Sequence, residues 1–334
     1  MRLNDLRQTP SSFEDAEGVW LERGPFVCGP QFWYSIEGYE REENAMGPEL
    51  IVWGVVFVAA LSLGFYSFFI EPRRLSVTRH EIRSPELPEG FDGVRIVQFS
   101  DTHLYHYYSL ERFERLVEKI NELEPDIVAF TGDLFDARRK KTSTGDSAVS
   151  PSLARIRAPL GKFAVYGNHD FGYDRRTRTS GPLLAEGGFA VLVNETRKIE
   201  LPSGEYITVT GLDDGLRGRP EPERTLGALP ERGFHLLLAH EPDMAIRLGA
   251  YPVDLQLSGH SHGGQVALPG FGAVIRTENG RKYVRGMFYL RQTNRRDRPY
   301  RLYVNRGIGT TRLRARLASV PELTVFTLRR GPYE

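Results

Sequence analysis

Residues 94–103 read VRIVQFSDTH, a short β-rich run that ends directly in polar, chemically versatile residues. A strand that runs into an active-site loop has this form. The segment that follows has apolar side chains at helical spacing, with Ser109 placed to cap the helix and Pro125 placed to end it. A second β-rich run, DIVAFT at residues 126–131, then leads into Gly132-Asp133. The order predicts a βαβ unit with parallel strands.

The same pattern recurs further along the chain. The β-rich runs at residues 162–166, 234–239 and 253–258 are each followed by a histidine-bearing motif. Because open α/β sheets gather ligands outside the carboxyl ends of their strands, we expect these motifs to converge. Residues 198–213 are expected to form two strands around a turn, and the tail 281–328 alternates as β structure does. Two facing sheets with outer helices, an α/β fold, account for these patterns.

An uncharged, mostly apolar stretch runs from Leu50 to Ile70. It is long enough to cross a hydrocarbon core of about 30 Å as a helix. A buried core helix is the alternative, but such helices rarely run this far without a charge. We therefore predict three parts: a poorly ordered N-terminal segment at residues 1–49, a transmembrane helix at 50–70 and a globular domain at 71–334.

The charges that flank the apolar stretch predict its orientation. Upstream of it lie Glu42, Glu43 and Glu49 against Arg41, whereas the downstream flank carries Arg73, Arg74, Arg79 and Arg83. Loops rich in Lys and Arg stay on the cytoplasmic side of a membrane. We therefore expect a single-pass protein of the cell membrane with its globular domain in the cytoplasm.

The net charge of +1 hides an asymmetry along the chain. Residues 1–50 hold 4 Lys/Arg against 10 Asp/Glu, which leaves 40 against 33 for the remainder. That remainder is biased toward anionic partners such as phosphates or a lipid surface. No basic block with interleaved aromatics argues for nucleic acid, so no nucleic-acid partner is expected. A single cysteine, Cys28, excludes an intrachain disulfide and a zinc site built on thiolates.

A basic, Ser/Thr-rich insert at residues 137–151 has no apolar period and is expected to be a mobile loop. It follows Asp136 directly. Its cationic side chains could grip an anionic substrate, with a solvated loop as the alternative. These side chains are Arg138, Arg139, Lys140 and Lys141.

Five short motifs with histidines and carboxylates occur in a fixed order. They are Asp101-Thr102-His103, Gly132-Asp133-Leu134-Phe135-Asp136, Gly167-Asn168-His169-Asp170, His240-Glu241-Pro242 and Gly259-His260-Ser261-His262. Together they supply the oxygen and imidazole ligands that two divalent ions require, and manganese, iron or zinc would suit them equally. Two metals need a bridging ligand, which Asp133 at a strand tip can provide. Such a pair can clamp the attacking and leaving oxygens of a phosphate ester.

From about Val94 to its end the chain resembles the calcineurin-like metallophosphoesterase superfamily, especially its membrane-anchored bacterial members, because all five family motifs are present in order. The resemblance implies a four-layer α/β/β/α sandwich within residues 71–334. It also implies two metal-ligand sets with a bridging hydroxide as the nucleophile. Asp101, His103 and His262 would hold one metal, Asn168, His240 and His260 the other, and Asp133 would bridge them.

Three further residues carry catalytic expectations under this resemblance. His169 would contact the phosphoryl oxygen or protonate the leaving group rather than bind metal, and Asp170 would fix its orientation. Many relatives have Glu where this chain has Asp170, which leaves the carboxylate chemistry intact. Asp136 is expected to be a supporting group near His169.

The substrate is predicted only as a class. The apolar stretch and the basic domain favour a phosphate ester at the bilayer, namely a phosphodiester or pyrophosphate, with lipid-linked substrates included in this class. A cyclic-nucleotide phosphodiesterase and a protein phosphatase are the enzymatic alternatives. A catalytically idle scaffold of the same fold is the non-enzymatic one, and the presence of His169 beside every ligand argues against it.

Overall fold

The computed structural model describes residues 47–136, 147–172, 174, 176–268, 271–274, 276–291 and 298–333. Residues 1–46 of the expected N-terminal segment lie outside this part of the chain. So do the basic side chains of the insert, Arg138, Arg139, Lys140 and Lys141.

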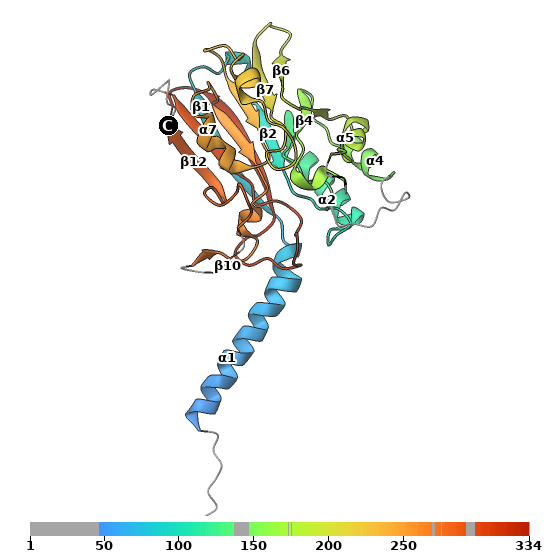
Figure 1. The fold of residues 1–334 in the computed structure, drawn as a ribbon, viewed down its shortest axis with the longest axis vertical. Helices are drawn as coiled ribbons and strands as arrows, with labels where there is room; N and C mark the ends of the chain where they lie inside the picture. The colour runs from blue at the N-terminus through green and yellow to red at the C-terminus, as the bar shows by residue number, and fades with distance from the viewer. Residues whose placement is uncertain are drawn as a thin grey trace, which may run out of the picture. The chain divides into compact units, whose positions relative to one another are not determined.

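Two six-stranded sheets form the framework of the domain (Figure 1). The first has the order β1-β14-β2-β3-β4-β5, with bounds Ser76–Ser84, Glu322–Arg330, Arg95–Phe99, Ile127–Phe130, Gly161–Ala164 and Ala190–Val191. The second has the order β12-β13-β9-β8-β7-β6, with bounds Gly286–Arg291, Pro299–Val304, Leu255–Ser258, His235–Leu238, Tyr206–Gly211 and Glu195–Glu200. A small hairpin pairs β10, Ala267–Leu268, with β11, Gly272–Ala273.

The centre of each sheet is parallel, as the βαβ pattern predicts. Strands β2 to β5 run parallel in the first sheet, and β7, β8, β9 and β13 run parallel in the second. Every histidine- and carboxylate-bearing motif follows directly after one of these central strands. The edge of the fold where these strands end therefore receives all of them.

Three apolar clusters separate the layers and confirm the four-layer α/β/β/α sandwich. One lies between the sheets and takes residues from both, including Ile96 of β2 and Leu236 of β8. A second packs the outer face of the first sheet, through Val97, against helices that lie beside it in Figure 1. The third covers the outer face of the second sheet, through Leu237. Neighbouring residues of one strand thus point to opposite clusters, as the two-residue period of a strand requires.

The helices flanking the sheets are short except for one. Helix α2, Leu110–Glu122, begins as predicted, because the Ser109 side chain accepts a hydrogen bond from Arg112 N at 3.3 Å. The others are α4 at Val149–Ala154, α5 at Gly181–Glu186, α6 at Pro222–Leu226 and α7 at Ala245–Leu248. Single 3₁₀ turns occur at Glu89–Phe91, Asn168–Asp170, Pro242–Met244 and His262–Gly264.

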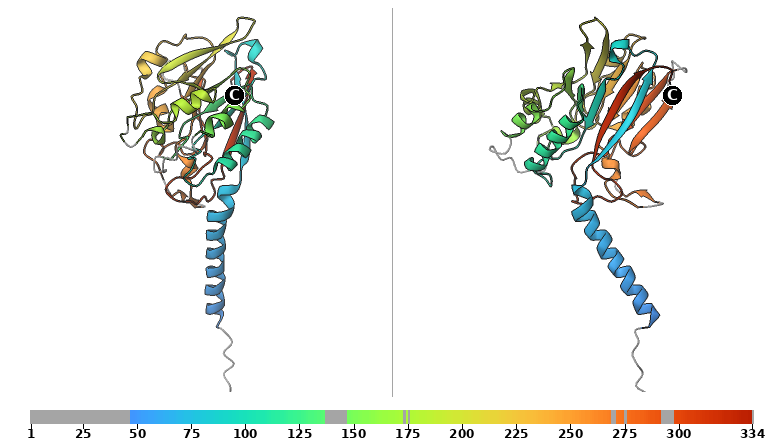
Figure 2. Two further views of the ribbon diagram at one scale, coloured as in Figure 1. Left: turned by 90° about the vertical axis from the view of Figure 1, so that its right-hand side faces the viewer. Right: turned by 180° about the vertical axis from the view of Figure 1, so that it is seen from behind.

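Two predictions need correction: the loop at residues 137–151 and the continuous β structure at residues 281–328. The loop expected over 137–151 ends early, since residues 149–151 already belong to α4, where Val149 and Leu153 are buried in the cluster under α2. In the tail 281–328, residues 305–321 form a loop between β13 and β14 rather than strands. A strand that the sequence analysis did not anticipate, β1, pairs in parallel with β14 at the end of the chain (Figure 2).

The apolar stretch is helical. Helix α1, Pro48–Phe65, continues through a π-helical turn at Tyr66–Ile70 and a 3₁₀ turn at Glu71–Arg73. These 26 residues have a mean hydropathy of 2.1 over their most apolar window, only 6% of which is buried inside the protein. A core helix of this composition would be covered by other elements. The helix is therefore long, apolar and exposed enough to associate with a membrane.

His235, outside the predicted metal-ligand motifs, is enclosed at the start of β8. Its Nδ1 lies 2.7 Å from Thr208 Oγ1 and its Nε2 lies 2.9 Å from Pro230 O. A neutral ring satisfies both contacts, with Nε2–H donating to the carbonyl and Nδ1 accepting from the hydroxyl. Burial, assisted by the charge of Arg298, lowers the pKa of His235 to about 4.

We therefore expect His235 to make stability fall in mild acid. The unfolded ring takes up a proton near pH 6.5, whereas the folded ring does so only near pH 4, so folding is penalised as the pH drops through this window. Between pH 7 and pH 5 the free energy of unfolding should fall by about 2 kcal/mol through this group. His235→Gln lacks the titration, so urea unfolding curves of the variant should show a loss smaller by that amount. Equal losses in both proteins would contradict the assignment.

Candidate metal centre

The loops after β2, β3, β4, β8 and β9 bring the predicted ligands together at one edge of the two sheets. Three sets of side chains each place their ligand atoms within 4.8 Å of one another. The sets are Asp101, His103 and His262; Asp133, His240 and His260; and His103, Asp136 and His169. Residues separated by up to 161 positions in sequence thus share one site.

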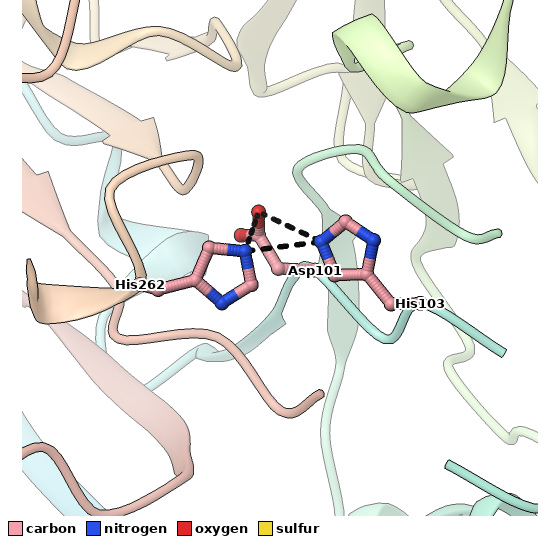
Figure 3. Close-up of side chains that lie close together, drawn as sticks. All are labelled: Asp101, His103 and His262. Atoms are coloured by element: carbon pink, nitrogen blue, oxygen red, sulfur yellow. Dashed lines mark hydrogen bonds and ion pairs between the residues drawn. The ribbon is translucent and has the colours of Figure 1, made fainter. Parts of the chain in front are cut away.

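In the first set the ligand atoms face a common point (Figure 3). Asp101 Oδ1 lies 3.4 Å from His262 Nε2 and 4.0 Å from His103 Nε2, and the two ring nitrogens are 3.0 Å apart. All three side chains are buried. One carboxylate oxygen and two imidazole nitrogens in this arrangement can hold a divalent ion.

Asp133 lies between the two sets. Its Oδ2 is 3.3 Å from His240 Nε2 and 3.6 Å from His103 Nε2. On the far side, His260 Nδ1 is 3.3 Å from His240 Nε2. A carboxylate with imidazoles of both sets around one oxygen has the position expected of a bridge between two cations.

Asn168 adds an amide oxygen to this neighbourhood. Its Oδ1 is buried and has no hydrogen-bond partner within the part of the chain that the structure describes. A buried polar atom without a partner costs about 1 to 3 kcal/mol, so such atoms generally have an explanation. A cation beside it would provide one, which fits the predicted role of Asn168.

Backbone carbonyls orient two of the rings. His240 Nδ1 lies 2.6 Å from Thr131 O, and His260 Nε2 lies 2.6 Å from Glu278 O. A carbonyl only accepts, so each of these nitrogens carries the hydrogen and donates it. The opposite nitrogens, His240 Nε2 and His260 Nδ1, are then left with lone pairs directed into the site, as metal-binding histidines require.

The electrostatics of the site favour neutral rings at three of the four predicted histidine ligands, whereas at His240 the charge of Asp133 outweighs burial and raises the pKa well above its ordinary value. Burial lowers the pKa of His103 and of His260 to about 3 and that of His262 well below its ordinary value. These rings are therefore unprotonated and available as ligands at neutral pH. Burial raises the pKa of Asp101 to about 6, which reflects the cost of enclosing its negative charge. Divalent ions beside it would offset this cost.

Five of the seven predicted metal ligands have a left-handed backbone. Their φ angles are 53° at Asp101, 44° at His103, 61° at Asp133, 68° at His260 and 51° at His262. This conformation costs roughly 1 to 2 kcal/mol per non-glycine residue and is concentrated at functional sites. The fold therefore holds these side chains in place against a local preference. Nothing in the sequence signalled this feature.

Close backbone approach explains two glycines at the site. A Cβ on Gly132, whose φ is 97°, would lie 2.6 Å from Gly167 N and 2.7 Å from His240 Nδ1. A Cβ on Gly307 would lie 2.8 Å from Asp101 Cβ. The sequence analysis did not connect the loop after β13 with the site. Gly309 N nevertheless donates to Asp101 O at 2.7 Å, so that loop supports the Asp101 backbone.

Two of the three predicted catalytic residues, Asp136 and His169, belong to the third set, and Asp170 is the third. Asp136 Oδ2 is 3.6 Å from His103 Nδ1 and 3.8 Å from His169 Nδ1, so it lies between those two rings. The ring of His169 packs edge-on against that of His103, and its side chain is 22% exposed. His169 is thus the one among these three that solvent or a substrate can reach.

Asp170 is expected to orient His169, but its carboxylate binds backbone N–H groups. It is fully buried and accepts hydrogen bonds from Asp133 N, Leu134 N and Gly167 N at 2.8, 2.9 and 2.8 Å. These contacts fix the turn that carries Asp133. His169 N in turn donates to Asp133 Oδ1 at 2.8 Å, so the β3 and β4 loops hold each other.

Arg316 is a supporting residue that the sequence analysis missed. It is fully buried in the loop between β13 and β14, and its guanidinium donates to the carbonyls of Arg306, Gly307, Gly309 and Ser319. The Ser319 hydroxyl then donates to His262 O at 2.7 Å. Arg316 belongs to no motif, and only the fold reveals its place.

Comparison with known proteins gives a consistent result. The family model for calcineurin-like phosphoesterases matches residues 94–264. The uncharacterised metallophosphoesterase YkuE of Bacillus subtilis is 42% identical over 83% of this chain and 95% of its own length. The UDP-2,3-diacylglucosamine pyrophosphatase LpxG of Chlamydia trachomatis is 30% identical over 77% of this chain and 90% of its own length. The phosphodiesterase YaeI of Escherichia coli is 29% identical, covering 80% and 94%.

The grouping of ligands predicts a specific metal stoichiometry. The wild-type chain loaded with manganese should hold two ions, and His262→Ala should hold about one, because only the first set loses a ligand. Asp133→Asn should lose most of both, since it removes the charge shared by the two sets. Metal analysis by mass spectrometry after gel filtration measures the ratio, with His235→Gln as a control that keeps two. A wild-type ratio of one, or two ions retained in His262→Ala, would refute the grouping.

Proposed function

The chain belongs to the calcineurin-like phosphoesterase family, and from this premise we propose that it hydrolyses phosphodiesters or pyrophosphates at a membrane through two bound divalent ions. The chain is a metallophosphoesterase by its family, and the relatives named as a pyrophosphatase and a phosphodiesterase agree with this assignment. The observation that carries the proposal is the carboxylate of Asp133 between the imidazoles of His103 and His240.

In the proposed centre the ligands form two groups that share one residue. Asp101, His103 and His262 hold one ion, Asn168, His240 and His260 hold the other, and Asp133 contacts both. When bound, the two ions supply an activated water and stabilise negative charge on the phosphoryl oxygens. Manganese, iron and zinc all suit these ligands.

His169 is proposed to act on the substrate itself. Its partly exposed ring at the edge of the centre can donate a hydrogen bond to a phosphoryl oxygen or a proton to the leaving group. Asp136 Oδ2 lies 3.8 Å from His169 Nδ1 and can hold the ring in position. Asp170 contributes indirectly, because its three backbone hydrogen bonds hold the Asp133 turn.

The proposed substrate is a lipid-linked phosphate ester. The exposed apolar helix would keep the enzyme at a bilayer, where such a substrate is concentrated. LpxG, the relative named for a diacylated sugar nucleotide, supports a pyrophosphate with acyl chains. The domain at residues 71–334 would then work beside the single span at 50–70, on the cytoplasmic side according to its flanking arginines.

The substrate class can be tested by comparing rates. The manganese-loaded full chain in detergent micelles should cleave a diacylated sugar pyrophosphate at least about tenfold more efficiently, in kcat/KM, than a cyclic nucleotide or a phosphoserine peptide. A preference for the cyclic nucleotide or the peptide would overturn the lipid-linked substrate and leave the metal chemistry intact.

The role of His169 can be tested separately from metal binding. His169→Ala should retain both ions while kcat falls by about 10²- to 10⁴-fold, as expected when an acid-base group is lost. Asp133→Asn should lose ions and turnover together. Steady-state rates and metal content are measured on the same preparations, with His235→Gln as the control. Full activity in His169→Ala would show that this ring does not take part in the reaction.

A further inference from the structure

A basic cavity lies beside the last turns of the apolar helix. Its volume is about 260 Å³, and its lining includes Arg73, Arg74, Tyr108, Arg112, Arg115 and Ile308. A narrower hollow shares four of these residues and adds Phe68 and Arg314. None of the predicted metal ligands or catalytic residues lines either space.

Five arginines surround these two hollows, and neither has an Asp or Glu in its described lining. Arg115 is paired with Glu111 at 2.6 Å, but that pair is on the exposed side of α2. Burial lowers the pKa of Arg112, the Tyr108 hydroxyl opposes this, and the charges of Arg73, Arg115 and Arg314 lower it further. The surrounding cations therefore repel one another, and an anion in the cavity would relieve that repulsion.

Neighbouring side chains and backbone hold two of these guanidinium groups. Arg112 lies over the ring of Tyr108, with its Cζ 4.5 Å from the ring centroid, and Arg112 Nη2 donates to Pro72 O. Arg74 Nη1 donates to Tyr66 Oη at 2.8 Å. Each contact fixes a side chain while leaving other N–H groups of the planar fork available. Such forks recognise phosphate oxygens in pairs.

The cavity is anchored to the apolar helix. Phe68 and Arg73 belong to its last turns, and Arg74 follows directly after them. The buried carboxylate of Glu71 accepts hydrogen bonds from Ala318 N and Ser319 N at 3.1 and 2.6 Å, which fastens the helix end to the domain. Arginines just beyond an apolar span lie at the depth of lipid phosphates.

We propose that this cavity binds the headgroup phosphate of an anionic phospholipid, at a site separate from the metal centre. The inference rests on the proposed membrane span and does not depend on the proposed reaction. Arg73 and Arg112, which line both hollows, contact the phosphate. Arg314 and Phe68 approach it from the narrower hollow, with Phe68 along the first part of an acyl chain. The bound lipid thus fixes the domain at the membrane surface.

Lipid retention tests the proposal directly. The full chain is placed in nanodiscs of phosphatidylcholine with about one phosphatidylglycerol in ten lipids, extracted into mild detergent and weighed with its bound lipids by native mass spectrometry. The wild type should retain phosphatidylglycerol at least about tenfold over its share of the bilayer, and Arg73→Gln/Arg314→Gln should lower that enrichment by about tenfold or more. Arg112→Gln should do the same.

A matched control removes equal charge elsewhere. Arg197→Gln/Arg224→Gln changes two exposed arginines outside the cavity and should keep the wild-type enrichment. Retention of the two lipids in the bulk ratio by the wild type, or full enrichment in both cavity variants, would overturn the proposal.

Titration with soluble ligands distinguishes a lipid from free phosphate. Dihexanoyl-phosphatidylglycerol should bind the detergent-solubilised chain at least about tenfold more tightly than inorganic phosphate, because the acyl chains add buried apolar area. The cavity variants should weaken that binding. Equal affinity for inorganic phosphate would assign the cavity to a soluble anion and contradict the lipid. This titration requires neither membrane insertion nor catalysis. Its result can therefore be interpreted even if the proposed membrane span or the proposed reaction is wrong.

Discussion

Negative charge buried at the meeting point of two sheets is the constraint on which this structure depends. Asp101 and Asp133 are enclosed among imidazole rings, of which those of His103 and His262 are neutral. The pKa of His240 is raised, because the charge of Asp133 outweighs the effect of burial. Isolated carboxylates in such a setting cost several kcal/mol each, so they persist only beside a compensating charge. Two divalent ions meet that requirement with the ligand types present. The same ions would then provide the chemistry of phosphate ester cleavage.

The fold stabilises this arrangement at some distance from the ligands. The ligand turns follow parallel strands whose apolar residues are buried on both faces, which gives the left-handed residues a rigid support. Asp170 holds the Asp133 turn through three backbone N–H groups, and Arg316 holds the loop that touches Asp101 and His262. These contacts fix the positions of the ligands without a bound ion. They also explain why a charged residue outside the motifs, Arg316, is buried beside the site.

The central strands and the position of the ligands could be predicted from the sequence, because each motif directly follows a β-rich run. The run at residues 94–99 and the cap at Ser109 gave a βαβ unit, and the position of Asp133 at a strand tip placed it in the site. Contacts between distant segments were not accessible in this way. Strand β1 is polar along much of its length and gains its place only by pairing with β14 at the end of the chain. The loop after β13 reads as a turn, and only packing brings Gly307 against Asp101. Arg316 carries no local signal, since its partners are backbone carbonyls and the distant His262 Nδ1 at 3.5 Å.

The helix and the metal centre meet through one loop. Ser67 O accepts a hydrogen bond from Arg316 N at 2.9 Å, so the residue that supports the centre also contacts the helix end. The apolar helix and the candidate metal centre are thereby linked through one backbone hydrogen bond. The central claim is the pair of ions around Asp133, and an anomalous difference map from crystals of the manganese-loaded protein tests it most directly. The account predicts two peaks, one among Asp101, His103 and His262 and one among Asn168, His240 and His260, with Asp133 between them. A single peak, or peaks remote from Asp133, would contradict it.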